Sequence, residues 1–214
     1  VRRYSHRDRA TCGAHVQDQT VPSSRQPTTD LAFIAVFAAL IAAFSLVPGI
    51  PVGPVPITLQ TLGVALAGLV LGPWRGFAAT ALYLAVGFAG LPVFAGGASG
   101  LGVLAKPSIG YLLSFPVAAL VAGLLARWLS GRNPRLRFLW LFLAGLGASI
   151  LIIHPAGLIG LMTILHIDFA KALAIDIVFW PGDVAKNLAA AAVALAVHKA
   201  FPALLSQRGP GSPA

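Results

Sequence analysis

The chain contains no glutamate, and all six of its acidic residues are aspartates. Charged residues make up only 10% of the 214 residues, whereas soluble domains usually carry about 25%. Hydrophobic residues reach 57%, and the mean hydropathy is +0.85. This scarcity of charge excludes an ordinary soluble domain, and the composition is typical of an integral membrane protein.

Two further absences narrow the function. The chain has a single cysteine, Cys12, so it cannot form an internal disulfide. It has no G-x-x-x-x-G-K-[ST] phosphate-binding loop, so ATP-driven work would need separate ATPase subunits. A net charge of +9 would suggest a nucleic-acid partner for a soluble protein. Here the basic residues lie between apolar runs, which indicates membrane orientation and lipid surroundings, and no nucleic acid.

Six apolar runs approach the length of about 20 residues that a helix needs to cross a bilayer. They predict an all-α integral membrane protein with six transmembrane helices, at residues 31–47, 57–72, 74–90, 111–129, 138–165 and 181–201. Residues 1–30 are polar and basic, so we expect a disordered N-terminal tail, a membrane domain over 31–201 and a short C-terminal tail over 202–214. The first run ends in SLVPGIPVGP without a small-residue cleavage site, so we expect it to remain as a span.

The basic residues are distributed unevenly between the two sides that six spans would create. Six spans place both termini on one side, and the positive-inside rule identifies that side as the cytoplasm if it carries most of the lysines and arginines. It would carry Arg2, Arg3, Arg7, Arg9, Arg25, Arg75, Arg127, Arg132, Arg135, Arg137, Lys199 and Arg208. The outer side would carry Lys106, Lys171 and Lys186, with Asp168, Asp176 and Asp183. The charges that orientation does not explain therefore gather at the outer mouth.

The last run contains two charges that a membrane span does not require. Pro181 fits the first turn of a helix, where its missing N–H costs nothing, so we expect the helix to begin there. Asp183 then falls in the first turn, and Lys186 follows three residues later on a neighbouring face. Two interpretations remain open. The pair is either an interfacial carboxylate with an outward-reaching lysine, or a functional site, because ionisable residues inside a membrane are costly.

Two outer segments are too irregular to span. Residues 87–115 contain seven glycines, and the segment PGIPVGPVPITLQTL is rich in proline. Glycine lets the backbone approach a ligand closely, and non-helical backbone near a membrane is tolerated only where protein or a water-filled cavity covers it. An ordinary glycine-rich hairpin loop remains the alternative for residues 87–115.

Four stretches together resemble one family: PVPITLQTLGVALAGLVLGPWRG, GFAGLPVFAGG, KPSIGYLLSF and PGDVAKNLAAA. The chain resembles the BioY family, the biotin-binding membrane subunits, or S components, of energy-coupling factor vitamin transporters. With matching span order, the resemblance covers residues 31–201. It implies a six-helix S-component fold in the cell membrane that captures biotin from outside, without enzymatic activity and with no cofactor besides the transported biotin.

The resemblance also implies site residues. Asp183 and Lys186 match the aspartate and lysine of the family's GD..K motif, which line the vitamin pocket. Lys106 matches a basic residue ahead of the PS.GYL stretch and would contact the biotin carboxylate. The loop Pro92–Gly97, with Phe94, Gly96 and Gly97, is similar to part of the pocket lid.

Biotin offers ureido N–H donors and a carbonyl, an apolar ring and chain, and a carboxylate. Asp183 would accept a ureido N–H, while Lys186 would donate to the carbonyl or hold Asp183 ionised. Phe94, Tyr111 and Trp180 would cover the apolar middle, or else serve as packing or interfacial belt residues. Gln60 and Thr58 at a span entrance are either pocket residues or hydrogen-bonding groups at the start of a helix.

A stripe of small residues runs along the first span. Ala35, Ala39 and Ala43 recur every four residues, a spacing that lets helices approach closely in a membrane. The resemblance implies that the transmembrane coupling subunit, which works with ATP-binding cassette ATPases, docks on this stripe. The alternative is chance spacing in an alanine-rich helix.

Other functions compete with biotin capture. An S component for thiamine or riboflavin would share the fold, and the GD..K and PVFAGG stretches favour biotin over those vitamins. A membrane enzyme could invoke His154 and His166, but a helix break and an interfacial cap are the expected roles of these residues. A small proton-coupled secondary transporter would need a relay, which one carboxylate does not supply, and no inverted repeat is evident.

Overall fold

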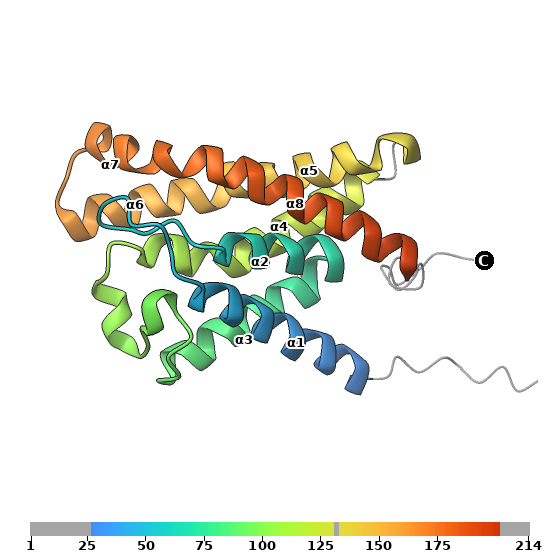
Figure 1. Ribbon diagram of the computed structural model, residues 1–214, viewed down its shortest axis with the longest axis horizontal. Helices are drawn as coiled ribbons and strands as arrows, with labels where there is room; N and C mark the ends of the chain where they lie inside the picture. The colour runs from blue at the N-terminus through green and yellow to red at the C-terminus, as the bar shows by residue number, and fades with distance from the viewer. Residues whose placement is uncertain (1–26, 131–132, 202–214) are drawn as a thin grey trace, which may run out of the picture.

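The computed structural model describes residues 27–130 and 133–201, and within these ranges the chain is helical (Figure 1). Extended pairing in this part of the chain is restricted to isolated bridges, such as the one between Ile50 and Ile57. The α-helices are α1 Pro27–Leu46, α2 Gln60–Leu66, α3 Pro73–Phe88, α4 Ile109–Ser130, α5 Arg137–Ala148, α6 His154–Leu165, α7 Phe169–Asp176 and α8 Trp180–Ala200. The predicted all-α fold is confirmed.

Short helical turns of other types join or flank these helices. Two are π-helical, η1 Ala67–Leu71 and η5 Ser149–Ile153, and four are 3-10 turns, η2 Ala95–Gly97, η3 Leu101–Ala105, η4 Pro134–Leu136 and η6 Ile177–Phe179. Because η1 continues α2 and η5 joins α5 to α6, the described residues form six long helical segments. They coincide with the six predicted runs to within a few residues at most ends.

Membrane-spanning length and composition are clear for three segments, Thr28–Leu46, Ile109–Leu129 and Pro134–Leu165. A shorter apolar helix covers Gln60–Leu71. The first helix begins at Pro27, inside the stretch that the sequence predicts as tail. The rest of that predicted tail, and the predicted C-terminal tail over 202–214, lie outside the described residues.

Helix α4 occupies the middle of the bundle. It packs against α3, α5 and α6, while α1 packs on α3, and α8 packs on α5 and α2. A close approach of α4 and α6 depends on Gly110, where an added Cβ would lie 2.0 Å from the Ala156 carbonyl oxygen. Small residues at such crossings are typical of membrane helices.

The two ends of the bundle differ. Helix α1 begins and α8 ends at the same end, on the right in Figure 1, while η2, η3 and α7 lie at the opposite end. We call the second end the loop end. Three connections gather there: residues 47–59 between α1 and α2, residues 89–108 between α3 and α4, and the turn at residues 166–168 between α6 and α7, after which α7 leads through η6 into α8. It is the end where irregular backbone can enclose a cavity.

The helix break that the sequence predicts at His154 is wrong. The chain passes from α5 into α6 through η5, a π-helical turn over Ser149–Ile153. Pro155 lacks an N–H, and it follows directly on the turn in which the regular ladder is already interrupted. The helix therefore continues through the proline, and His154 points into the protein with a relative exposure of 4%. His166, by contrast, is the C-cap of α6 and has a left-handed conformation. Its predicted position at a membrane interface stays a prediction.

Candidate ligand-binding site

A pocket opens at the loop end of the bundle. Its empty volume is about 720 Å³, including space open to solvent, which is within the usual range for small-molecule sites. Four parts of the chain supply most of its wall: the segment before α2 with the start of that helix, residues 94–108, the first turns of α4, and the first turns of α8. The lining residues are Val55, Pro56, Ile57, Thr58, Gln60, Thr61, Phe94, Ala95, Ala98, Val103, Lys106, Ser108, Tyr111, Leu112, Phe115, Ile153, Phe179, Asp183 and Lys186.

Asp183 and Lys186 form a close ion pair on one wall of the pocket. The distance from Lys186 Nζ to Asp183 Oδ1 is 2.6 Å, and the two side chains are 12% and 6% exposed. Pro181 lies in the first turn of α8, so Asp183 falls in the first turn as the sequence predicts. The interpretation of Lys186 as an outward-reaching lysine is wrong, because its side chain turns inward and contacts α2. A buried ion pair that faces a cavity carries a desolvation cost, which points to function rather than to stability.

The ammonium group of Lys186 is surrounded by protein acceptors. It pairs with Asp183 Oδ1, and it donates to the Thr61 hydroxyl at 2.8 Å and to the Thr58 carbonyl oxygen at 3.1 Å. An ammonium group has three protons, and three protein oxygens face this one. Thr61 Oγ1 in turn donates to Asp183 Oδ1 at 3.1 Å. Of the two roles that the sequence leaves open for Lys186, this geometry favours holding Asp183 ionised.

Gln60 lines the pocket, and its amide also ties α2 to the connection between α3 and α4. Its Nε2 donates to the Tyr83 hydroxyl. The Tyr83 hydroxyl donates to the Val93 carbonyl oxygen at 3.1 Å, and Ser45 of α1 donates to that same oxygen. Side chains from three helices therefore hold the backbone beside Phe94 through these hydrogen bonds. We call Gln60, Tyr83, Ser45 and Val93 the lid anchor.

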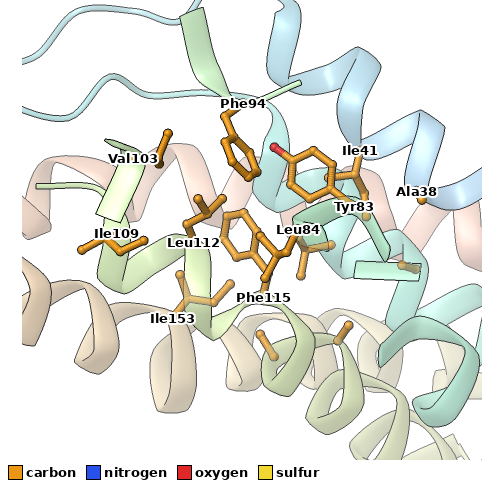
Figure 2. Packing of buried hydrophobic residues seen from close by; sticks show 14 residues of the cluster. Ala38, Ile41, Tyr83, Leu84, Phe94, Val103, Ile109, Leu112, Phe115 and Ile153 are labelled. Carbon is orange, nitrogen blue, oxygen red and sulfur yellow. The ribbon is translucent and has the colours of Figure 1, made fainter. Parts of the chain in front are cut away.

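Phe94 closes the side of the pocket next to the lid anchor. Figure 2 shows its ring pointing from the loop into the core, toward Tyr83. The ring packs edge-on against Tyr83 at 5.5 Å and against Phe88 at 5.3 Å between centroids. It sits directly over Gly87 of α3, where an added Cβ would lie 2.2 Å from the ring. The absence of a side chain at Gly87 is therefore a requirement of the closed loop.

Lys106 lies at the mouth of the pocket, after η3. It is exposed and yet contributes to the lining. Within residues 27–130 and 133–201, no hydrogen bond or ion pair engages its side chain, so the ammonium group is available to an anion entering the pocket.

Six of the eight predicted ligand contacts line this one pocket: Asp183, Lys186, Lys106, Phe94, Tyr111 and Gln60. Gly96 and Gly97 do not. They are exposed, with φ of +69° and +73°, so their visible role is a left-handed turn that L side chains rarely adopt. Contact of these two glycines with a ligand stays a prediction.

The roles of two buried residues behind the pocket wall were not predicted from the sequence. His154 Nδ1 lies 2.9 Å from Asp176 Oδ1, and His154 Nε2 lies 3.4 Å from Asp183 Oδ2. Asp176 also accepts hydrogen bonds from the Tyr111 hydroxyl at 2.7 Å and from Trp180 Nε1 at 2.9 Å. Trp180 therefore supports this cluster and does not line the pocket. The sequence held one indication that Asp176 lies near Asp183. The two residues are seven positions apart and fall on one face of a nearly continuous helical path.

The predicted docking stripe is unobstructed. Ala35, Ala39 and Ala43 are all exposed on α1, while Ala38 and Ile41 on the other side of the helix are buried. Docking of a partner on this stripe stays a prediction. A metal-dependent enzyme would need a cluster of metal ligands. The described residues contain no group of three or more His, Cys, Asp or Glu placed to hold a metal ion.

Comparison with known proteins identifies the family. A model of the BioY family matches residues 16–203. The chain is 39% identical over 181 residues to the biotin transporter BioY of Rhizobium etli, covering 83% of this chain and 97% of the relative. It is 40% identical over 194 residues to the biotin transporter BioY of Rhodobacter capsulatus, covering 84% and 98%. The solved S-component for biotin from an ECF-type ABC transporter is similar with a TM-score of 0.73 at 29% identity, covering 83% of this chain and 94% of that chain. The chain, an all-α membrane protein with the S-component fold, belongs to the BioY family.

Proposed function

We propose that this protein is the biotin-binding membrane subunit of a vitamin uptake transporter. The observation that carries the proposal is the buried Asp183–Lys186 pair on the wall of a pocket at the loop end, in a chain of the BioY family. The relatives named above are biotin transporters, and the structural neighbour is an S-component for biotin. The subunit binds its ligand without changing it chemically, and it uses no cofactor.

The chemistry of the pocket suits the three parts of biotin. Asp183 accepts an N–H of the ureido ring, because carboxylate oxygens accept only. The apolar ring and chain lie against aromatic and aliphatic side chains of the wall, among them Phe94, Tyr111 and Phe115. Lys106 at the mouth pairs with the carboxylate. An apolar wall with a small number of placed polar groups is the typical arrangement of a small-molecule site.

A ligand panel tests this function. The purified protein is heated with biotin, thiamine or riboflavin, and the unfolding midpoint is measured for each. Ligand that binds only the folded state raises the midpoint by mass action, so biotin should raise it and the other two vitamins should not. A shift with thiamine or riboflavin and none with biotin would assign the subunit to another vitamin.

Lys106 provides a test of ligand orientation. Lys106→Ala should weaken the binding of biotin several-fold but leave biotin methyl ester nearly unchanged, because only the acid carries the charge that Lys106 pairs. An exposed charge pair contributes about 0.2–1 kcal/mol, which is at most about fivefold in affinity. Calorimetric titration with both ligands measures the difference. Lys171→Ala, at an exposed lysine in α7, is the matched control, and equal losses for acid and ester would remove Lys106 from this role.

The energising partners are a transmembrane coupling subunit and ATP-binding cassette ATPases, and α1 is the proposed docking face. Ala39→Trp should lower the yield of the assembled transporter severalfold and leave biotin binding intact, because tryptophan holds the helices apart where alanine lets them meet. Co-purification with tagged partner subunits measures assembly. The control is Ala192→Trp, the same change at an exposed alanine of α8. Wild-type yield with Ala39→Trp would place the docking face elsewhere.

The subunit crosses the plasma membrane several times, with both termini in the cytoplasm and the loop end outside. The supporting observation is that, within residues 27–130 and 133–201, Lys106, Lys171 and Lys186 are the only lysines or arginines on the side of the loop end in the six-span arrangement. In a chain with Cys12 replaced by serine, a cysteine introduced for Lys171 should therefore react with a membrane-impermeant thiol reagent in intact cells. Labelling only after the membrane is permeabilised would reverse the orientation.

A further inference from the structure

His154 lies between two carboxylates in the interior of the protein. Its Nδ1 is 2.9 Å from Asp176 Oδ1, and its Nε2 is 3.4 Å from Asp183 Oδ2. The side chains of these three residues are at most 6% exposed. The ring also packs against the indole of Trp180, with 5.3 Å between centroids. No water or surface group is needed to explain the arrangement, because each ring nitrogen already faces an oxygen.

The arrangement favours a doubly protonated ring. An ionised carboxylate oxygen can only accept, so a ring nitrogen donates to it only when that nitrogen carries a proton. A neutral imidazole has one N–H and would present a lone pair to the other carboxylate. The charged groups facing or adjoining the ring are Asp176 from α7 and Asp183 with Lys186 from α8, and Tyr111 from α4 donates to Asp176. With His154 as imidazolium, two negative charges balance two positive charges, which lowers the cost of burying them.

The effect of a protonated His154 on Asp183 follows from the hydrogen-bond acceptor sites of that carboxylate. An ionised carboxylate has about four lone-pair sites, two on each oxygen. Thr61 and Lys186 both approach Oδ1, and His154 approaches Oδ2. One site therefore remains, on Oδ2, and Asp183 lines the pocket. An Nε2–H that faces Oδ2 would keep the carboxylate from rotating and would leave this last site available to a ligand donor.

We propose that His154 is a positioning residue for ligand capture, which bridges Asp176 and Asp183 as an imidazolium and thereby presents one oxygen of Asp183 to an N–H of the bound ligand. The inference rests on the proposed function for the identity of that ligand. Loss of the ring proton leaves the shorter bond to Asp176 in place and turns a lone pair of Nε2 toward Asp183 Oδ2. Asp183 then moves away from the ring, and affinity falls as pH rises through the titration of His154.

Nitrogen NMR of the full chain labelled at histidine tests the protonation directly, with and without biotin. At neutral pH both ring nitrogens of His154 should resonate as protonated, and affinity measured by calorimetry in the same buffers should fall in step with loss of that signal. The assignment uses His154→Gln, and His166→Asn is the control, since asparagine tolerates the left-handed backbone of His166 at the end of α6. His154→Gln should bind biotin about tenfold more weakly at neutral pH, because the charged contact to Asp183 is lost, and its affinity should no longer follow the wild-type pH profile.

An unprotonated nitrogen in the wild-type ring at neutral pH would overturn the inference, whether or not His154→Gln folds. So would a wild-type affinity that changes out of step with the ring signal. These outcomes are distinct from failure of the proposed function, because a protein that binds no biotin still reports the protonation of His154 in its free form.

Discussion

Replacing Asp183 by asparagine should weaken biotin binding by at least about tenfold. The asparagine would keep the shape and one acceptor oxygen, but its amide nitrogen would meet donors from Thr61 and Lys186 or from His154. A buried donor or charge left without its partner costs about 1–3 kcal/mol, and more when it is charged. Each 1.4 kcal/mol is about tenfold in affinity. Calorimetric titration of the purified variant with biotin measures the change.

Further variants separate this effect from general damage. Asp183→Ala should bind still more weakly, because it removes both oxygens. Lys186→Ala should also lose affinity, and the double variant should lose less than the sum, since the two side chains act as one unit. Asp168→Asn is the matched control: it makes the same change at the exposed N-cap of α7, where asparagine also caps well. Wild-type affinity in a folded Asp183→Asn would reduce Asp183 to a helix-terminal carboxylate.

The fold was predictable because membrane spans depend on length and apolar content, which are properties of the sequence alone. The same reasoning about the cost of charge in a membrane identified Asp183 and Lys186 as candidate site residues. Charges are so costly in a membrane that their presence inside a predicted span is informative without any structure. The resemblance then gave roles to Lys106 and to the loop with Phe94, which the charge distribution and the glycine content only place on the outer side.

The cluster around His154 was not predictable in this way. The sequence places His154 in the fifth span and Asp176 in the connection that follows, and nothing in their spacing says that α7 folds back to join them. The π-helical turn before His154 adds to the difficulty. It changes which face each later residue of α6 occupies, so a regular helical period gives the wrong orientation for His154.

The direction of Lys186 was also beyond the sequence. A lysine near the end of a span can extend to the headgroups or turn inward, and the choice depends on acceptors supplied by another helix. Here Thr58 and Thr61 of the α2 segment supply them. The stretch ITLQTL was recognised as polar at a span entrance, but its contact with α8 is a long-range property of the fold.

The loop over the pocket depends on the absence of one side chain. Phe94 lies over Gly87 with 2% of its surface exposed, and Tyr83 and Phe88 pack edge-on against its ring. The Gly87 carbonyl oxygen also accepts from the Gly90 amide at 3.2 Å and from the Gly100 amide at 2.8 Å, so the chain before and after Phe94 is bonded to this residue. Any added atom at Gly87 must displace the ring from its place beside the lid anchor.

Gly87→Ala should therefore weaken biotin binding by about tenfold or more, chiefly through faster dissociation. The new Cβ would lie 2.2 Å from the Phe94 ring, and overpacking of this kind costs about 1–3 kcal/mol, with about 1.4 kcal/mol per tenfold. Release of labelled biotin from the purified protein measures the rate. Gly102→Ala is the control, because a Cβ there meets nothing within 4 Å. In a Phe94→Ala background the added Gly87→Ala change should cost little, since the clash is gone. Equal losses from Gly87→Ala in the two backgrounds would show that the ring does not close the pocket.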